Sequence, residues 1–177
     1  MLSKKMLDAF NDQINAEFYS AYLYYAMAAH LESKGLAGMA QWMKLQAIEE
    51  QVHAAKMFDF VNERGGRVVL GAIEAPPLEW NAPRDVFEAA YKHEVHVTSL
   101  LNKLMDLAIE EHDHASQAFL QWYISEQVEE EASAQEVVQK LELAGQTQGG
   151  LFMIDRELGQ RQVTLPAMPG LVVGPKA

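Results

Sequence analysis

The chain has 177 residues, no cysteine and a net charge of −11 at pH 7. This length suits one domain with a sizeable core, and the lack of cysteine excludes disulfides, thiolate metal sites and a cysteine nucleophile. The acidic charge argues against nucleic acid as a partner, and charged residues interrupt the apolar positions near the N-terminus, so we expect no signal peptide, no membrane segment and a cytoplasmic location.

The first 66 residues predict two long helices joined by a tight turn. Apolar residues recur there at alternating steps of three and four, which is the pattern of helices that pack at a shallow angle. Ser3 is a candidate cap for the first helix, and Gly35 is a candidate stop because glycine adopts the left-handed cap conformation at low cost. Gly65–Gly66 ends the second helix in the same way.

Two further helices follow a long connection. The third begins at Asn81-Ala82-Pro83, and the fourth runs from a cap at Asp113 to about Gly145. Residues 65–83 are too long for a hairpin loop, and at about 3.3 Å per residue they span roughly 60 Å, more than a 30-residue helix of about 45 Å. The sequence therefore predicts an all-α fold: an antiparallel four-helix bundle with one long crossover.

The C-terminal region adds a short fifth helix and a tail. Residues 150–158 have helical spacing of apolar side chains, so we assign residues 1–159 to the bundle with its fifth helix. Residues 160–177 are rich in proline and glycine, and we expect an extended or disordered tail.

A repeated set of polar residues lies on the apolar seams of the four helices. Glu17 is followed after 33 residues by Glu50-x-x-His53, and Glu94 is followed after 33 residues by Gln127-x-x-Glu130. Two hairpins with the same spacing bring these side chains to nearly the same height in the bundle. This arrangement is typical of bundles that hold two metal ions.

Burial of several carboxylates in one core needs compensation. Each uncompensated buried charge costs on the order of several kcal/mol, and no Lys or Arg occupies these seam positions. Either the carboxyl groups are protonated or cations bind among them, and oxygen-rich ligands with one imidazole suit iron or manganese. Taken singly, each residue could also be a polar layer that sets the register of the bundle.

Several sequence segments resemble the prokaryotic non-haem ferritins over about residues 3–160. They are Asn15-Ala16-Glu17, residues 19–25, Glu49-Glu50-Gln51-Val52-His53-Ala54, Glu94, Trp122-Tyr123 and Glu126-Gln127-Val128-Glu129-Glu130. The resemblance implies a ferroxidase centre in which Glu17, Glu50 and His53 bind one iron ion, and Glu50, Glu94 and Gln127 bind the second. It also implies a third iron site formed by Glu49, Glu126, Glu129 and Glu130, whereas the repeat by itself places Glu130 in the central pair.

Other residues have two interpretations each. In the resembling ferritins the tyrosine at position 24 neighbours the centre, where it orients a ligand or donates an electron, but Tyr24 is equally a core tyrosine. Trp122, one turn before Glu126, has the same two interpretations. His112 and His114, in the turn between the third and fourth helices, are either part of a solvated acidic loop or a cation entrance between subunits.

Differences between this sequence and related families narrow the choice of function. Bacterioferritins carry a haem-ligating methionine directly after the second-helix glutamate, where this chain has Gln51, so we expect no haem. A fifth helix is absent from the twelve-subunit mini-ferritins. The neutral amide of Gln127 removes one negative charge from the second iron site, which favours release of Fe³⁺ over permanent binding.

The resemblance implies iron storage with ferroxidase activity. Fe²⁺ is oxidised by O₂ or H₂O₂ at a transient di-iron centre, and ferric oxyhydroxide is deposited in a homo-oligomeric shell of 24 subunits. An electron-donor protein that docks for iron release is a further candidate partner. Two alternatives remain open at this point: a redox enzyme with a fixed di-iron or manganese cofactor, and a structural or signalling helical bundle without metal.

Overall fold

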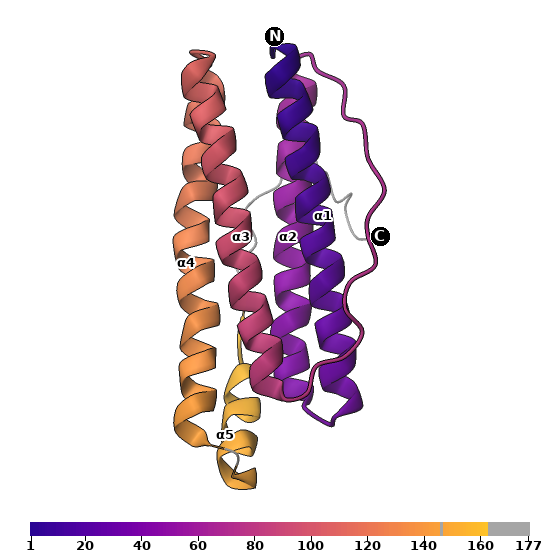
Figure 1. Ribbon diagram of the computed structural model, residues 1–177, viewed down its shortest axis with the longest axis vertical. Helices are drawn as coiled ribbons and strands as arrows, with labels where there is room; N and C mark the ends of the chain where they lie inside the picture. Colours follow the sequence, from indigo (N-terminus) through magenta and orange to yellow (C-terminus); the bar gives the residue numbers. More distant parts are fainter. Residues whose placement is uncertain (146, 163–177) are drawn as a thin grey trace, which may run out of the picture.

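The computed structural model describes residues 1–145 and 147–162, which form five α-helices and no strand (Figure 1). The helices are α1 (Lys4–Ser33), α2 (Ala37–Glu63), α3 (Pro83–Glu110), α4 (His114–Ala144) and α5 (Gln148–Leu158). The predicted all-α bundle with a short fifth helix is therefore confirmed. None of the described helices combines the length and apolar character that a membrane crossing requires.

The predicted caps stabilise the helix ends. The Ser3 side chain accepts a hydrogen bond from the Met6 backbone N–H at the start of α1, and the Asp113 side chain accepts one from the Ser116 N–H at the start of α4. Gly35 has a φ of 76°, as expected for a residue that reverses the chain after a helix. α5 begins two residues earlier than predicted, because the Thr147 side chain caps it.

Two antiparallel hairpins, α1–α2 and α3–α4, lie side by side, and the crossover of residues 64–82 runs along the length of the bundle (Figure 1). Side chains of α1 hold this crossover in place. Asn11 accepts a hydrogen bond from the Val69 backbone N–H at 3.0 Å, and Asn15 donates one to the Ala72 carbonyl oxygen at 3.4 Å. The long connection predicted from residues 65–83 is confirmed.

Two apolar clusters fill the ends of the bundle and leave a polar layer between them. One cluster contains Tyr24, Met27 and Met43, and the other contains Phe10, Ile14 and Leu120. In each of α1 to α4 the candidate ligands lie between the segments that contribute to these two clusters. The apolar ends fix the positions of the helices, and the middle layer is left for the charged side chains.

The fifth helix packs against the start of α2. A Cβ atom added to Gly38 would lie 1.7 Å from the Asp155 carbonyl oxygen, so only glycine allows this approach. Asp155 also accepts a hydrogen bond from the Met39 backbone N–H at 2.9 Å and thereby caps α2, whose own N-cap residue, Leu36, provides no side-chain acceptor. The predicted tail of residues 160–177 lies outside the described residues from residue 163 onward.

Candidate metal centre

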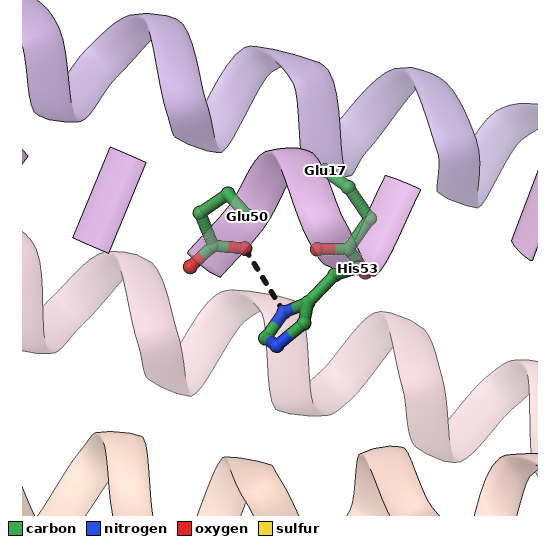
Figure 2. Close-up of side chains that lie close together, drawn as sticks. All are labelled: Glu17, Glu50 and His53. Carbon is green, nitrogen blue, oxygen red and sulfur yellow. Dashed lines mark ion pairs between the residues drawn. The ribbon is translucent and has the colours of Figure 1, made fainter. Parts of the chain in front are cut away.

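The first hairpin contributes one group of possible metal ligands. Glu17 of α1 and Glu50 and His53 of α2 each offer one ligand atom, and these atoms lie within 4.8 Å of one another. Glu50 and His53 are three residues apart, which places both side chains on the same face of α2. Figure 2 shows the three side chains converging in the bundle interior, with His53 Nδ1 3.4 Å from Glu50 Oε2.

A second group joins the two hairpins. Glu50, Glu94 of α3 and Glu130 of α4 also offer ligand atoms within 4.8 Å of one another, so Glu50 belongs to both groups. His53 Nδ1 is 4.0 Å from Glu130 Oε1, which brings Glu130 close to the first group as well. The structure thus places Glu130 in the central layer, as the sequence repeat predicts.

Unpartnered oxygen atoms indicate that this layer is suited to cations. Glu17, Glu50 and Glu94 are each 1% exposed, and Glu130 is 7% exposed. Glu17 Oε2, Glu50 Oε1 and Glu130 Oε2 are buried and have no hydrogen-bond partner among the described residues. Because a buried acceptor without a partner is costly, these atoms fit a site that a positive charge completes.

Burial and mutual repulsion favour the protonated forms of Glu50 and Glu130 when no cation is bound. Burial raises the pKa of Glu50 well above its ordinary value, and the neighbouring Glu94 and Glu17 raise it further. Burial, with repulsion from Glu50 and Glu94, has the same effect on the pKa of Glu130. Metal binding must therefore displace protons from the layer.

Glu94 differs from the other carboxylates because both of its oxygens accept hydrogen bonds. The Tyr24 hydroxyl donates to Oε1, and the Gln127 amide Nε2 donates to Oε2 at 3.0 Å. Burial raises the pKa of Glu94, and these two hydrogen bonds oppose that rise. Gln127 also donates to the Glu94 backbone oxygen at 3.2 Å and to Thr98 Oγ1 at 3.3 Å, so its amide group here supports Glu94.

Neighbouring side chains hold the ligands of the first hairpin. Gln13 Nε2 donates to Glu17 Oε1 at 2.8 Å from one turn earlier on α1. The Tyr123 hydroxyl donates to the His53 carbonyl oxygen at 2.9 Å. The Trp122 ring meets the His53 ring edge to face, with centroids 5.3 Å apart. Such contacts restrict the orientation of a ligand before a metal ion binds.

The residues expected at a third site are more dispersed. Glu49 and Glu126 are half-buried and Glu129 is exposed. Within the described residues, no three of Glu49, Glu126, Glu129 and Glu130 come within ligand distance of one another. Glu49 instead forms an ion pair with Arg161, in which Nη2 lies 2.8 Å from Oε2. The third site remains a prediction.

Sequence reasoning missed two residues of this region, Gln13 and Arg161. Gln13 is four residues before Glu17, so the helical spacing could have identified it. Arg161 is 112 residues from Glu49, and nothing in the local pattern indicated their contact. His112 and His114 lie at the turn between α3 and α4, where His112 has a φ of 53°, and they join no group of ligands within the described part of the chain.

Comparisons with known proteins agree with the fold. The family described as "Ferritin-like domain" matches residues 7–144. The chain is 45% identical over 161 residues to a bacterial non-heme ferritin of Bacteroides fragilis, covering 91% of this chain and 100% of the relative. It is 42% identical over 159 residues to a probable bacterial non-heme ferritin-like protein of Haemophilus influenzae, covering 90% and 96%. The structure of an open pore ferritin from Archaeoglobus fulgidus superimposes with a TM-score of 0.91 at 54% identity, covering 92% of this chain and 100% of that one.

Proposed function

The chain belongs to the ferritin family, and on that premise we propose that it oxidises Fe²⁺ at the central carboxylate layer and stores the Fe³⁺ product inside a shell of many copies. One observation carries this proposal. Two groups of ligands share Glu50, and three of their carboxylate oxygens are buried with no partner in the part of the chain that the structure describes. A pair of divalent cations satisfies these oxygens and balances the buried charge.

The side chains divide into ligands and supports. Glu17, Glu50 and His53 bind the first ferrous ion, and Glu50, Glu94 and Glu130 bind the second, with distances within each group that suit this division. Gln127 holds Glu94 in position by donating from its amide, and it becomes a ligand only if its amide turns to present the oxygen. Tyr24 orients the other Glu94 oxygen and is placed to donate an electron.

Iron is the substrate of this reaction. Two ferrous ions each give one electron to O₂, which takes up two protons and leaves as H₂O₂. If H₂O₂ is the oxidant, the two electrons and two protons convert it to two water molecules. The ferric ions are then hydrolysed by water to oxyhydroxide, and the released protons leave to solvent. The carboxylates bind the ions before oxidation and compete with water for the ferric product afterwards.

A storage site must release its product, and the second ligand group favours release. Glu94 regains two hydrogen bonds when its ion leaves, one from Tyr24 and one from Gln127. These hydrogen bonds stabilise the metal-free state, so the net affinity of the second ion is lower. Released iron passes to a third site formed by Glu49, Glu126 and Glu129 on the way to the store, and Glu130 is shared between the second ion and this site.

A single bundle cannot enclose a mineral, so storage requires assembly. Apolar side chains lie exposed at the junction of α4 and α5, where Leu143, Phe152 and Met153 are 88%, 68% and 72% exposed. Tyr22 and Tyr25 form a second exposed apolar region on α1. Contacts between copies cover such surfaces. We place the closed shell at 24 subunits, with α5 lining its four-fold channels. We expect no haem, because Gln51 stands where bacterioferritins carry the haem-ligating methionine.

An enzyme with a permanent di-iron or dimanganese cofactor is the second candidate, favoured by the fully buried ligand layer. Aerobic addition of a large excess of Fe²⁺ to metal-free protein, followed by sizing and counting of soluble iron per particle, separates the two. Retention of far more than two or three ions per chain in a large particle supports storage. Retention that stops at about two ions per chain overturns storage and favours the cofactor enzyme.

A further inference from the structure

Arg161 is held against α2 by three different contacts. Its guanidinium pairs with Glu49 at 2.8 Å, donates to the Trp42 carbonyl oxygen at 3.4 Å and lies 4.6 Å from the centre of the Trp42 ring. The side chains of Arg161 and Glu49 are only 22% and 23% exposed. A pair that is this sheltered and supported on several sides is stronger than an ordinary surface ion pair.

The packing of α5 determines where this guanidinium lies. Gly159 lies against Gly38, and Asp155 caps the start of α2, so the residues that follow α5 are anchored beside that helix. Arg161 comes two residues after Gly159 and extends along α2 to Glu49. The positive charge therefore comes from the C-terminal end of the described chain and is directed to α2 by the fold.

Glu49 connects this pair to the metal centre. It directly precedes Glu50, the carboxylate shared by both ligand groups. Burial raises the pKa of Glu49, the positive charge of Arg161 opposes this rise, and the negative charge of Glu126 adds to it. Arg161 is thus the positive charge that compensates a carboxylate beside the central layer.

We propose that Arg161 is a built-in counter-ion that competes with the third iron ion for Glu49. The inference rests on the proposed function and specifies how the third site of that function is regulated. When iron binds to Glu49, the guanidinium must leave the carboxylate, and the lost ion pair weakens the third site relative to the central pair. Iron therefore stays at the third site only briefly and moves on to the store.

The competition is reciprocal. If Arg161 weakens binding of the third ion, that ion must weaken the contact of Arg161 with Glu49 by the same factor. Because Arg161 follows α5 directly, iron at the third site loosens one of the contacts that attach the C-terminal end of the described chain to α2. The filling of the third site is thereby linked to the segment that follows α5.

The test is anaerobic calorimetric titration of Fe²⁺ into metal-free, assembled full-length protein. Arg161→Gln should bind the weakest ion about fivefold more tightly than the parent, the lower end of usual coupling between sites, while the two tighter ions change less than twofold. Arg156→Gln removes an equal charge from an exposed position of α5 and should leave all affinities unchanged. Arg161→Lys keeps the charge without the planar fork, and its weakest ion should bind with intermediate affinity.

A double variant identifies the partner through which Arg161 acts. In a Glu49→Gln background, replacing Arg161 by Gln should bring less than half the gain in binding free energy seen in the parent. Unchanged or weaker binding of the third ion in Arg161→Gln, or equal tightening in Arg156→Gln, overturns the proposal. If Arg161→Gln does not assemble, Arg161→Lys decides, and parent-like affinity there overturns it. Failure of the parent to bind a third ion also overturns the inference, whereas failure to bind even two ions overturns the proposed function itself, which is a different result.

Discussion

The two hairpins provide matching sets of ligands, but they leave their carboxylates in different states. In the α1–α2 hairpin, Glu17 Oε2 and Glu50 Oε1 are buried and have no hydrogen-bond partner among the described residues. In the α3–α4 hairpin, Glu130 Oε2 also lacks a partner there, but both oxygens of Glu94 accept hydrogen bonds from protein side chains. A cation at the first hairpin therefore satisfies oxygens that have no alternative partner, whereas a cation at Glu94 must displace existing hydrogen bonds.

In the proposed function, this difference gives nearly equivalent halves one tight and one releasable position. The carboxylate count alone would suggest similar affinities, because each half contributes two glutamates to the layer. The neighbours decide the outcome: an imidazole in the first half, and an amide and a phenol acting on Glu94 in the second. The net affinity for an ion depends on the hydrogen bonds that the carboxylate loses as well as on the contacts with the ion that it gains.

The largest effect should come from the carboxylate that the two halves share. Glu50→Gln removes a ligand from both groups, so the initial rate of aerobic Fe²⁺ oxidation should fall by about 100-fold or more, equivalent to about 3 kcal/mol in the barrier. Glu17→Gln should eliminate the tight ion and leave the other measurable by anaerobic titration. Glu136→Gln, which alters an exposed carboxylate of α4, is the control. A parent-like rate in Glu50→Gln would contradict the shared-ligand arrangement.

The free energy of unfolding of the metal-free protein should fall as the pH rises above about 4.5. The pKa values of Glu50, Glu94 and Glu130 are raised above the ordinary value of 4.5, so the folded state binds more protons than the unfolded state. Their stabilising contribution is complete below pH 4.5 and is lost as the pH rises through the raised values. Each extra proton contributes a slope of about 1.4 kcal/mol per pH unit, or tenfold in the unfolding constant.

Urea unfolding of the metal-free protein at fixed concentration, from pH 4.5 toward neutrality, measures this slope. The free energy of unfolding should fall over this range, and anaerobic Fe²⁺ should abolish or reverse the fall because bound cations replace the protons. Glu50→Gln should flatten the curve. Stability that rises with pH in the metal-free parent would show that the layer is ionised without cations.

Changing Gln127 tests the second half alone. Gln127→Glu replaces the donor to Glu94 by a carboxylate, so the second ion should bind about tenfold more tightly, about 1.4 kcal/mol, and turnover should slow because Fe³⁺ leaves less readily. Gln127→Leu removes the donor without adding charge and separates the two contributions. Titration combined with steady-state oxidation measures both. Unaltered turnover in Gln127→Glu would count against the role of the amide in release.

The fold was predictable because its signals are local or periodic. Apolar spacing identified the four long helices, and the caps at Ser3 and Asp113 marked the starts of two of them, α1 and α4. The length of the crossover determined the topology. The start of α5 was misplaced by two residues because Thr147 acts as a cap there, and the two glycines after Gln148 obscured the helical pattern.

The ligands were predictable where the sequence repeats their spacing. They were ambiguous where the orientation of a side chain decides between two candidates. Glu17, Glu50, His53 and Glu94 were expected in the central layer, and the structure places them there. Spacing could not decide between Glu130 and Gln127 as the fourth-helix ligand, because both face the layer. Arg161 was unpredictable, since its contact with Glu49 depends on how α5 packs against α2.

The smallest effect should come from the side chain that links the halves directly. The Tyr24 hydroxyl crosses from α1 to Glu94 of α3, and Tyr24→Phe removes this hydrogen bond without changing the bulk of the core. We expect the number of bound ions to be unchanged and oxidation to slow by a few-fold, in keeping with a hydrogen bond of about 1 kcal/mol. Tyr22→Phe, which alters an exposed tyrosine of the same helix, is the control.

The ratio of Fe²⁺ oxidised to O₂ consumed separates the two roles of this hydroxyl. If Tyr24 only orients Glu94, Tyr24→Phe slows oxidation and leaves the ratio unchanged. If Tyr24 supplies one of the electrons that reduce O₂, iron must supply that electron in the variant, so more Fe²⁺ is oxidised for each O₂ consumed in the first turnover and the ratio rises. A parent-like rate and ratio would mean that the link between the hairpins is structural, and the asymmetry of the centre would then depend on Gln127 alone.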